Sequence, residues 1–395
     1  MNRSLLILVS VGVVGLLVRA SEASAIPAFS RKYKVGCNMC HTVYPQLNEF
    51  GRDFKNNGYR TPDEVKTPDT SDFWSKGIDQ LPLTVHGKIS QQITPNGQPV
   101  TNATVLDELQ LNAAINFSNK VSFYLHTHLW EDGAAGEPLM VSLRINDLFN
   151  NQLASLRAGQ YQLPLSFSPE IERLSAFYYL VYTQAIGANP WTIDQPQLGF
   201  ELTGDLGNDV WYWAGLVNGS GFETNPFSGT LDDNSSKDPY LRIAKHFDEN
   251  SIGVFGYYGT NAILQEDTTG LDQTDKFYRI GGDINWNLSD LSVHTSVVYG
   301  HDNNFDGLDN NTFYYGGFLE GDYLATDRLM FLGRYDIVEL DKIEAAPDTG
   351  TEKTTWAITP GVQYLVLPNI KVGLEYQFRP VKNDDRGLVI LHFAL

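Results

Sequence analysis

Residues 121–129 read Val-Ser-Phe-Tyr-Leu-His-Thr-His-Leu, and apolar side chains alternate with polar ones along them. Successive side chains of a β-strand point to opposite faces, so this period of two predicts a strand with one apolar and one polar face. The same alternation recurs in residues 139–146 and 372–378 and continues toward the C-terminal end. We therefore expect residues 81–395 to form one mainly β domain.

The lengths of these segments and of their connections indicate a barrel that crosses a membrane. The strands are predicted to span about 9–13 residues, close to what a tilted strand needs to cross a bilayer. Tight turns are expected at residues 118–120, 150–152 and 367–369, and longer polar loops at residues 232–237, 265–275, 302–311 and 344–352. Short turns on one side and long loops on the other predict a transmembrane antiparallel β-barrel of about 16 strands with a water-filled interior.

A soluble β-sandwich or β-propeller is the alternative fold, since its strands alternate too. The long strands, the charged and amide residues on their second face, and the aromatic clusters at 211–213 and 313–315 favour the barrel. Such clusters are suited to the interfacial girdles of a membrane barrel. One feature departs from the usual pattern, because the last predicted strand, 388–395, ends in Leu395, and its aromatic residue, Phe393, lies two positions earlier.

The N-terminal residues and the overall charge bear on destination and partners. Residues 1–25 combine Arg3, an apolar run and the small-residue pattern Ala23-Ser24-Ala25, which together predict a cleaved secretory signal. A membrane anchor is the alternative, but the run is short for a span of about 20 residues. The formal net charge of −19 argues against nucleic acid as a partner and is compatible with attraction of cations.

The strongest motif is Cys37-Asn-Met-Cys40-His41, which contains both cysteines of the chain. Cys-x-x-Cys-His is the attachment sequence of c-type haem. The two thiols form thioethers with the haem vinyl groups, and the histidine binds the iron from the proximal side. A redox-active cysteine pair is the alternative, but it calls for a thioredoxin-like βαβ context that the surrounding sequence lacks. We predict one covalent haem c on Cys37 and Cys40, with His41 as iron ligand.

The residues after the motif predict a helix. Four apolar residues recur there at helical spacing, namely Val43, Leu47, Phe50 and Phe54. Pro45 is tolerated in a first turn, and Gly58 would end the helix. We expect a small haem domain over residues 26–60, in which haem supplies much of the buried apolar surface. Residues 61–80, rich in Pro, Asp and Thr, are expected to form a linker with little regular structure.

The N-terminal region also resembles a known family. The matching residues are Phe29-Ser30-Arg31-Lys32-Tyr33, the haem motif, Pro45-x-Leu47-Asn48, Phe50-Gly51, Phe54 and Gly58-Tyr59. They resemble the fused monohaem cytochrome–porins of the outer membrane, best known from iron-oxidising bacteria. The resemblance is specific over residues 28–60, whereas the barrel half is similar in pattern.

The resemblance implies a protein in contact with outer-membrane lipid that oxidises extracellular Fe(II) through one haem. Its electrons would pass to a periplasmic cytochrome c or a similar carrier, which amounts to an Fe(II):cytochrome oxidoreductase activity. The haem domain would lie in the barrel lumen or at its periplasmic mouth. Two other functions stay open: a conduit that carries electrons outward, and a diffusion porin with a haem-bearing plug.

The sixth iron ligand is expected to come from the barrel. Within residues 26–80, His41 is the only histidine, and the only methionine, Met39, lies between the two cysteines. The alternation places several candidates on the polar, lumenal face, and the ones we select for the sixth ligand or the lumen lining are His126, His128 and Met140. The others on that face are His86, His246, His294, His392 and Met330, whereas His301 lies at the edge of a loop.

One acidic loop partly matches a metal-binding motif. Asp302, Asn304, Asp306 and Gly307 match the opening of an EF-hand loop, but Phe313 stands where the bidentate Glu belongs. A solvated acidic loop that concentrates divalent cations near the outer mouth is therefore favoured over a calcium site.

Overall fold

The computed structural model describes residues 28–66, 83–95, 101–131, 133–166, 169, 172–219, 234–263, 273–341, 354–380 and 385–394. The predicted signal at residues 1–25 lies outside this part of the chain, as do the loop at 344–352 and most of the expected linker. Within the described residues, no helix is both long enough and apolar enough to span a membrane.

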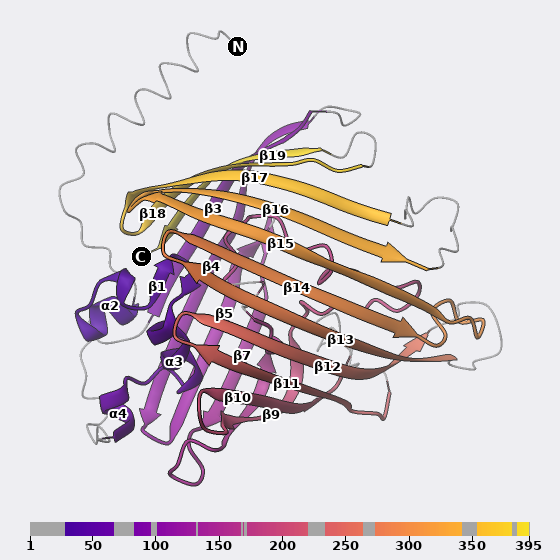
Figure 1. Ribbon diagram of the computed structural model, residues 1–395, viewed down its shortest axis with the longest axis horizontal. Coiled ribbons are helices and arrows are strands. Elements are labelled where there is room, and N and C mark those ends of the chain that lie inside the picture. Colours follow the sequence, from indigo (N-terminus) through magenta and orange to yellow (C-terminus); the bar gives the residue numbers. More distant parts are fainter. Residues whose placement is uncertain are drawn as a thin grey trace.

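The described strands form a closed antiparallel barrel of 16 long strands, as the alternation predicts (Figure 1). Each strand pairs with its neighbour in sequence, and β19 pairs with β3 to close the ring. A two-residue strand, β6 (Ala134–Ala135), extends the wall next to β5. The long strands are β3 (Leu83–Thr94), β4 (Thr101–Ser118), β5 (Val121–Glu131), β7 (Pro138–Ile145), β8 (Ser155–Tyr161), β9 (Gln197–Asp205), β10 (Val210–Val217), β11 (Asp238–Phe247), β12 (Asn250–Ile263), β13 (Gln273–Leu288), β14 (Leu291–Asp302), β15 (Thr312–Thr326), β16 (Leu329–Leu340), β17 (Thr354–Leu367), β18 (Ile370–Gln377) and β19 (Arg386–Ala394).

The two faces of the wall have opposite chemistry. On β5, His126 and His128 point inward and are at most 3% exposed, whereas Leu129 points outward and is 47% exposed. On β12, the outward Val254 is 59% exposed and the inward Phe255 is 5% exposed. An outer surface of apolar side chains around one closed sheet fits a lipid environment and excludes the soluble sandwich or propeller.

The aromatic clusters divide between the two faces, because consecutive strand residues point in opposite directions. Trp211 and Trp213 face the lumen, where their rings stack with centroids 6.3 Å apart, and Tyr314 is fully buried inside. Tyr315 is 47% exposed on the outer face. Only part of each cluster is therefore available for an interfacial girdle.

The lumen is packed, which makes the predicted water-filled interior wrong over this part of the barrel. The described part of the connection between β8 and β9, residues 162–166, 169 and 172–196 (the inner segment), lies in the lumen (Figure 1). Its apolar residues join wall residues in one buried core. The core includes Leu163, Tyr179, Val181, Tyr182, Ile186, Trp191 and Ile193 from the inner segment, with Tyr257, Phe277, Tyr314 and Phe318 from the wall.

Buried ion pairs surround this core. Arg334 lies 2.6 Å from Asp336 and 3.6 Å from Glu320, and all three side chains are at most 1% exposed. Arg279 and Asp302 form a second pair at 2.7 Å, fully buried. The wall also binds the backbone of the inner segment, since Arg334 donates to the carbonyl oxygens of Phe177 and Tyr178 at 2.9 and 3.0 Å. Around this core, the polar lumenal face thus meets protein.

The N-terminal region lies at the end of the barrel where the hairpins turn tightly (Figure 1). Its elements are α2 (Ala28–Tyr33), the 3₁₀ turn η1 (Cys37–Met39), β1 (His41–Val43), β2 (Gln46–Leu47), α3 (Glu49–Asn56) and α4 (Pro62–Lys66). Arg52 donates to the backbone carbonyls of Asp248 and Glu249 in the β11–β12 turn, and Arg60 donates to Asn119 in the β4–β5 turn. These contacts fix residues 28–66 (the N-terminal segment) in the mouth.

The predicted helix is shorter than the apolar spacing indicated. Val43 and Leu47 belong to the small β1–β2 hairpin, and α3 begins only after Asn48, whose side chain accepts from the Gly51 amide at 2.9 Å. Pro45 lacks an amide proton and lies in the hairpin loop, where it needs no backbone donor. Short α4 occupies part of the expected linker, so that stretch is more regular than predicted.

The end of α3 follows the glycine as expected. Gly58 has a φ of +70°, a left-handed conformation that favours glycine. The Gly58 amide donates to the Lys55 carbonyl at 3.0 Å and the Tyr59 amide to the Phe54 carbonyl at 2.8 Å, which is a Schellman ending. The rings of Phe54 and Tyr59 meet edge to face at 5.8 Å, so the turn presents Tyr59 toward the lumen.

Candidate haem-binding site

A large cavity lies between the N-terminal segment and the barrel. It has about 1610 Å³ of space not occupied by protein atoms, part of it open to solvent. Cys37, Cys40 and His41 line it on one side, and strands β3, β4, β5, β18 and β19 line it on the other. Residues 172–176 of the inner segment form part of its boundary.

The two thiols lie next to each other at the edge of this cavity. Both are free, and the Cys40 amide donates to the Cys37 carbonyl at 3.2 Å across the η1 turn. Residues three apart in a 3₁₀ turn nearly eclipse one another, so the side chains project from the same side. Burial, helped by the neighbouring Cys37, raises the pKa of the Cys40 thiol. This arrangement suits two covalent bonds to one flat group.

His41 is oriented by the hairpin that follows it. Its Nδ1 lies 3.2 Å from the Pro45 carbonyl and 3.2 Å from the Gln46 carbonyl. Carbonyl oxygens only accept hydrogen bonds, so Nδ1 carries the proton and Nε2 keeps a free lone pair. Burial lowers the pKa of the imidazole, which favours the neutral form. A metal-binding histidine is held in this way in other proteins, with its second nitrogen bonded to a carbonyl.

Aromatic rings form an apolar side of the cavity. Phe29 meets Phe54 edge to face at 4.9 Å and stacks on Tyr59 at 5.6 Å. Tyr59 in turn stacks at 5.3 Å on Tyr124 of the barrel wall, which continues the cluster across the interface. A macrocycle placed here would bury its faces against these rings.

The barrel side carries histidines and lysines. His86 of β3 and His392 of β19 have ring centroids 5.9 Å apart, and the ring of Tyr44 lies 6.3 Å from that of His86. Lys371 of β18 is 6% exposed and donates to the Tyr44 carbonyl at 3.3 Å. Buried ammonium groups suit the carboxylates of haem propionates. The donor set and the apolar rings therefore fit a c-type haem.

The three selected sixth-ligand candidates lie elsewhere. His126 and His128 are not among the residues that line this cavity. His126 is hydrogen-bonded to Asn112, and His128 lies 2.8 Å from Glu131. Met140 lines the neighbouring cavity. His86 and His392 line this cavity instead, so they are better placed than the three selected residues. The alternation puts both on the lumenal face but does not show how near the mouth they lie.

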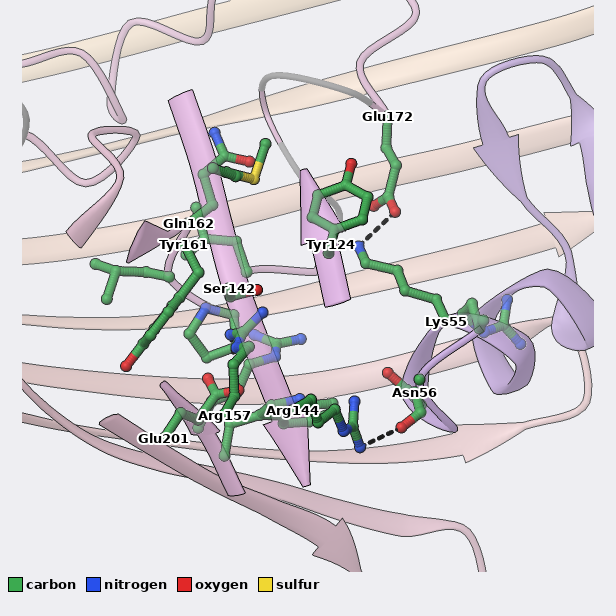
Figure 2. Close-up of a pocket in the computed structure, with 18 of the residues that line it drawn as sticks. Lys55, Asn56, Tyr124, Ser142, Arg144, Arg157, Tyr161, Gln162, Glu172 and Glu201 are labelled. Carbon is green, nitrogen blue, oxygen red and sulfur yellow. Dashed lines mark hydrogen bonds and ion pairs between the residues drawn. The ribbon is translucent and has the colours of Figure 1, made fainter. Parts of the chain in front are cut away.

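The neighbouring cavity has about 1200 Å³ of free space, part of it open to solvent, and shares Tyr59, Tyr124 and Glu172 with the first (Figure 2). Figure 2 shows Lys55 of α3 reaching Glu172 of the inner segment, with Nζ and Oε1 2.5 Å apart. Arg144 of β7 donates to the carbonyl of Asn56 at the end of α3. These contacts link the N-terminal segment to the inner segment and to the wall.

The acidic loop after β14 is not arranged as a calcium site. Asp302 pairs with Arg279 and accepts from Asn189, and Asp306 accepts from the Leu308 amide at 2.9 Å. Among the described residues, no three His, Cys, Asp or Glu side chains are placed to hold a metal ion together. Phe305 of this loop is buried in the lumenal core. The loop closes over the inner segment.

Comparisons with known proteins concern the barrel. No protein-family model and no curated protein matches this chain. Among solved structures, it is similar to the outer-membrane channel DcaP of Acinetobacter baumannii, with 12% identity over 82% of this chain and 100% of that chain and a TM-score of 0.56. The anion-selective porin from Comamonas acidovorans matches with 10% identity over 79% and 99% of the two chains and a TM-score of 0.57. OmpF of Salmonella typhi, in complex with daunomycin, matches with 13% identity over 80% and 97% and a TM-score of 0.55.

The chain has the fold of an outer-membrane porin. At these identities the similarity concerns the fold alone, and the N-terminal segment with its cysteines has to be interpreted from its own residues.

Proposed function

We propose that the chain is an outer-membrane electron-transfer cytochrome that carries one covalent haem c in the mouth of a porin-fold barrel. The observation that carries this proposal is the position of Cys37, Cys40 and His41 on one large cavity, with the Nε2 of His41 free to bind iron. Haem supplies reversible one-electron chemistry, and the protein sets its access and potential.

The arrangement of the barrel supports electron exchange on both sides of the membrane. In outer-membrane barrels the short turns face the periplasm, so the N-terminal segment would meet periplasmic partners. The turn that holds the cysteines lies at the surface, since Met39 is 42% exposed. A periplasmic cytochrome c or similar carrier would approach the haem edge there.

A third cavity, distinct from the neighbouring cavity in Figure 2, adjoins the haem cavity on the long-loop side. It shares Lys88, Glu108 and Ala176 with the haem cavity. Its acidic residues Asp107, Glu108 and Glu131 are matched by Lys88, Arg379 and Arg386, so attraction of cations would come from the net charge of −19 of the whole chain. These features support extracellular Fe(II) as the donor, and thus an Fe(II):cytochrome oxidoreductase activity.

The direct test is to purify the full chain in detergent, oxidise it, and mix it anaerobically with Fe(II) while recording the visible haem bands. We expect one haem per chain and growth of the reduced c-type spectrum with Fe(II). Dithionite gives the fully reduced reference. A haem that dithionite reduces and Fe(II) leaves oxidised would remove iron as donor, and a potential below that of candidate external acceptors would then favour the outward conduit.

A diffusion porin is the second candidate, because the barrel fold is similar to that of known channels. The packed interior speaks against it, since charged side chains such as Arg279 and Arg334 are fully buried rather than in contact with a water-filled pore. In planar bilayers we expect the wild-type protein to add almost no conductance, with OmpF as the open reference. A stable conductance comparable to that of OmpF would favour the porin.

A further inference from the structure

We propose that His86 of β3 is the sixth, distal ligand of the haem iron. This inference rests on the proposed function and adds to it that the barrel wall completes the iron site. The haem would then be bound covalently by the N-terminal segment and coordinated by the barrel, so that neither part alone forms the site.

A barrel residue is needed because the N-terminal segment offers no second ligand of the usual kind. Its only histidine is His41. Met39 lies between the two cysteines on η1 and is 42% exposed, so the thioether bonds on either side hold it away from the distal face. A histidine or methionine on the distal side therefore has to come from the wall.

His86 has the geometry of a histidine prepared for a metal. Its Nδ1 lies 3.2 Å from Oε1 of Gln110 on the adjacent strand β4. An amide oxygen only accepts, so Nδ1 holds the proton and Nε2 bears the lone pair. That Nε2 is buried in the described structure without a hydrogen-bond partner. A buried acceptor left unpaired carries a desolvation cost, which coordination to iron would remove.

Ring contacts place His86 near His41 within the cavity. The ring of Tyr44 lies 5.2 Å from that of His41 and 6.3 Å from that of His86, so both histidines contact the same side chain. All three residues line the haem cavity. The arrangement repeats at His86 what the hairpin does at His41, with Nδ1 on an oxygen and Nε2 free.

The other donors on the wall are less suitable. Lys88 is engaged by Glu108 at 3.2 Å, and Lys371 donates to the Tyr44 carbonyl at 3.3 Å, so both amines already have oxygen partners. His392 contacts the ring of His86 at 5.9 Å, whereas the ring contact of Tyr44 is with His86. It is the strongest competitor and belongs in the test.

The experiment compares the full-length wild type with His86→Ala, His392→Ala and His126→Ala, the last as a buried lumenal histidine outside the cavity. Each oxidised protein is examined by visible absorption and electron paramagnetic resonance, and its haem potential is measured. We expect a low-spin, six-coordinate haem in the wild type and in His126→Ala and His392→Ala. His86→Ala should lose the low-spin signal, become high-spin and shift in potential, and added imidazole should restore the low-spin signal.

A second variant guards against misfolding. His86→Met keeps a ligand of similar reach, and we expect a low-spin haem whose potential is raised, as Met/His coordination does in cytochromes c. An unchanged spectrum in His86→Ala, a high-spin wild type, or transfer of the effect to His392→Ala would overturn the assignment to His86 while leaving the haem intact. A wild-type chain without covalent haem would overturn the proposed function itself, together with this ligand.

Discussion

Replacement of both Cys37 and Cys40 by alanine is expected to abolish covalent haem, so that no haem remains with the chain after denaturation. The two thiols are the only cysteines, and they stand at the start of η1 and directly after its end, at the edge of the cavity. Without them nothing else in the chain can form a thioether. The measurement is peroxidase staining of the denatured chain on a gel, together with the intact mass, which should fall by one haem.

The barrel should survive this change and serve as its control. The wall is closed by 16 strands that do not include η1, so the double variant should still show the gel migration of a folded barrel before heating. Each single variant retains one thiol and should retain part of the covalent haem. If the double variant stained as strongly as the wild type, the haem motif would not be the attachment site.

The sequence predicted the wall of this protein well because a strand's chemistry is local. The alternation in residues 121–129 states which side chain faces lipid and which faces the lumen, and His126 and Leu129 lie as it indicated. Turn positions such as 118–120 follow from the same pattern, because the alternation stops where the chain reverses. The wall of a membrane barrel separates lipid from the lumen, and its side chains alternate between the two with a period of two. Few other arrangements of the strands are compatible with this pattern.

The alternation of apolar and polar residues did not predict that a segment of the chain fills the lumen. Polar side chains that face inward have the same sequence signature whether they meet water or the backbone of an entering segment. Glu375 illustrates this, since it accepts from the Ser175 hydroxyl at 2.7 Å and from the Ala176 amide at 2.9 Å. The inner segment has no regular period of its own, and only its position within the closed barrel makes Tyr179 and Trp191 core residues.

The candidate site also has one part that the sequence predicted and one part that it did not. Cys37, Cys40 and His41 are recognised from five consecutive residues, because covalent attachment fixes their spacing. Which barrel residues lie near this motif depends on how far along its strand each residue stands. His86 and His126 have the same inward direction, and only the height at which the N-terminal segment enters distinguishes them. Similarly, Pro45 and the pairing of His41 with Leu47 displaced the start of α3, which helical spacing alone placed too early.

The inner segment fills the lumen and also forms part of the boundary of the proposed haem cavity. Leu174, Ser175 and Ala176 line the haem cavity, and the next residues, Phe177 and Tyr178, accept from Arg334. The group that holds the segment in the lumen therefore also fixes one boundary of the cavity. Exclusion of water by this segment would strengthen electrostatic interactions near a bound haem.

Replacement of Arg334 by methionine is expected to destabilise the barrel by about 3–5 kcal/mol and to open the lumen. The change leaves Asp336 and Glu320 buried without their cation and removes both hydrogen bonds to the inner segment. Unfolding by urea in lipid vesicles, followed by tryptophan fluorescence, measures the first effect. Planar-bilayer conductance measures the second, and we expect a rise above the near-zero wild-type value.

Arg328→Met is the matched control, because Arg328 is exposed in the tight turn between β15 and β16. It should match the wild type in stability and conductance. Arg334→Met combined with Asp336→Asn should recover part of the stability, since it removes one uncompensated charge, but it should not restore the two bonds to the inner segment. A single Arg334→Met variant as stable and as closed as Arg328→Met would show that the buried pair does not hold the segment, and the apolar core around Tyr179 would then have to close the barrel by packing alone.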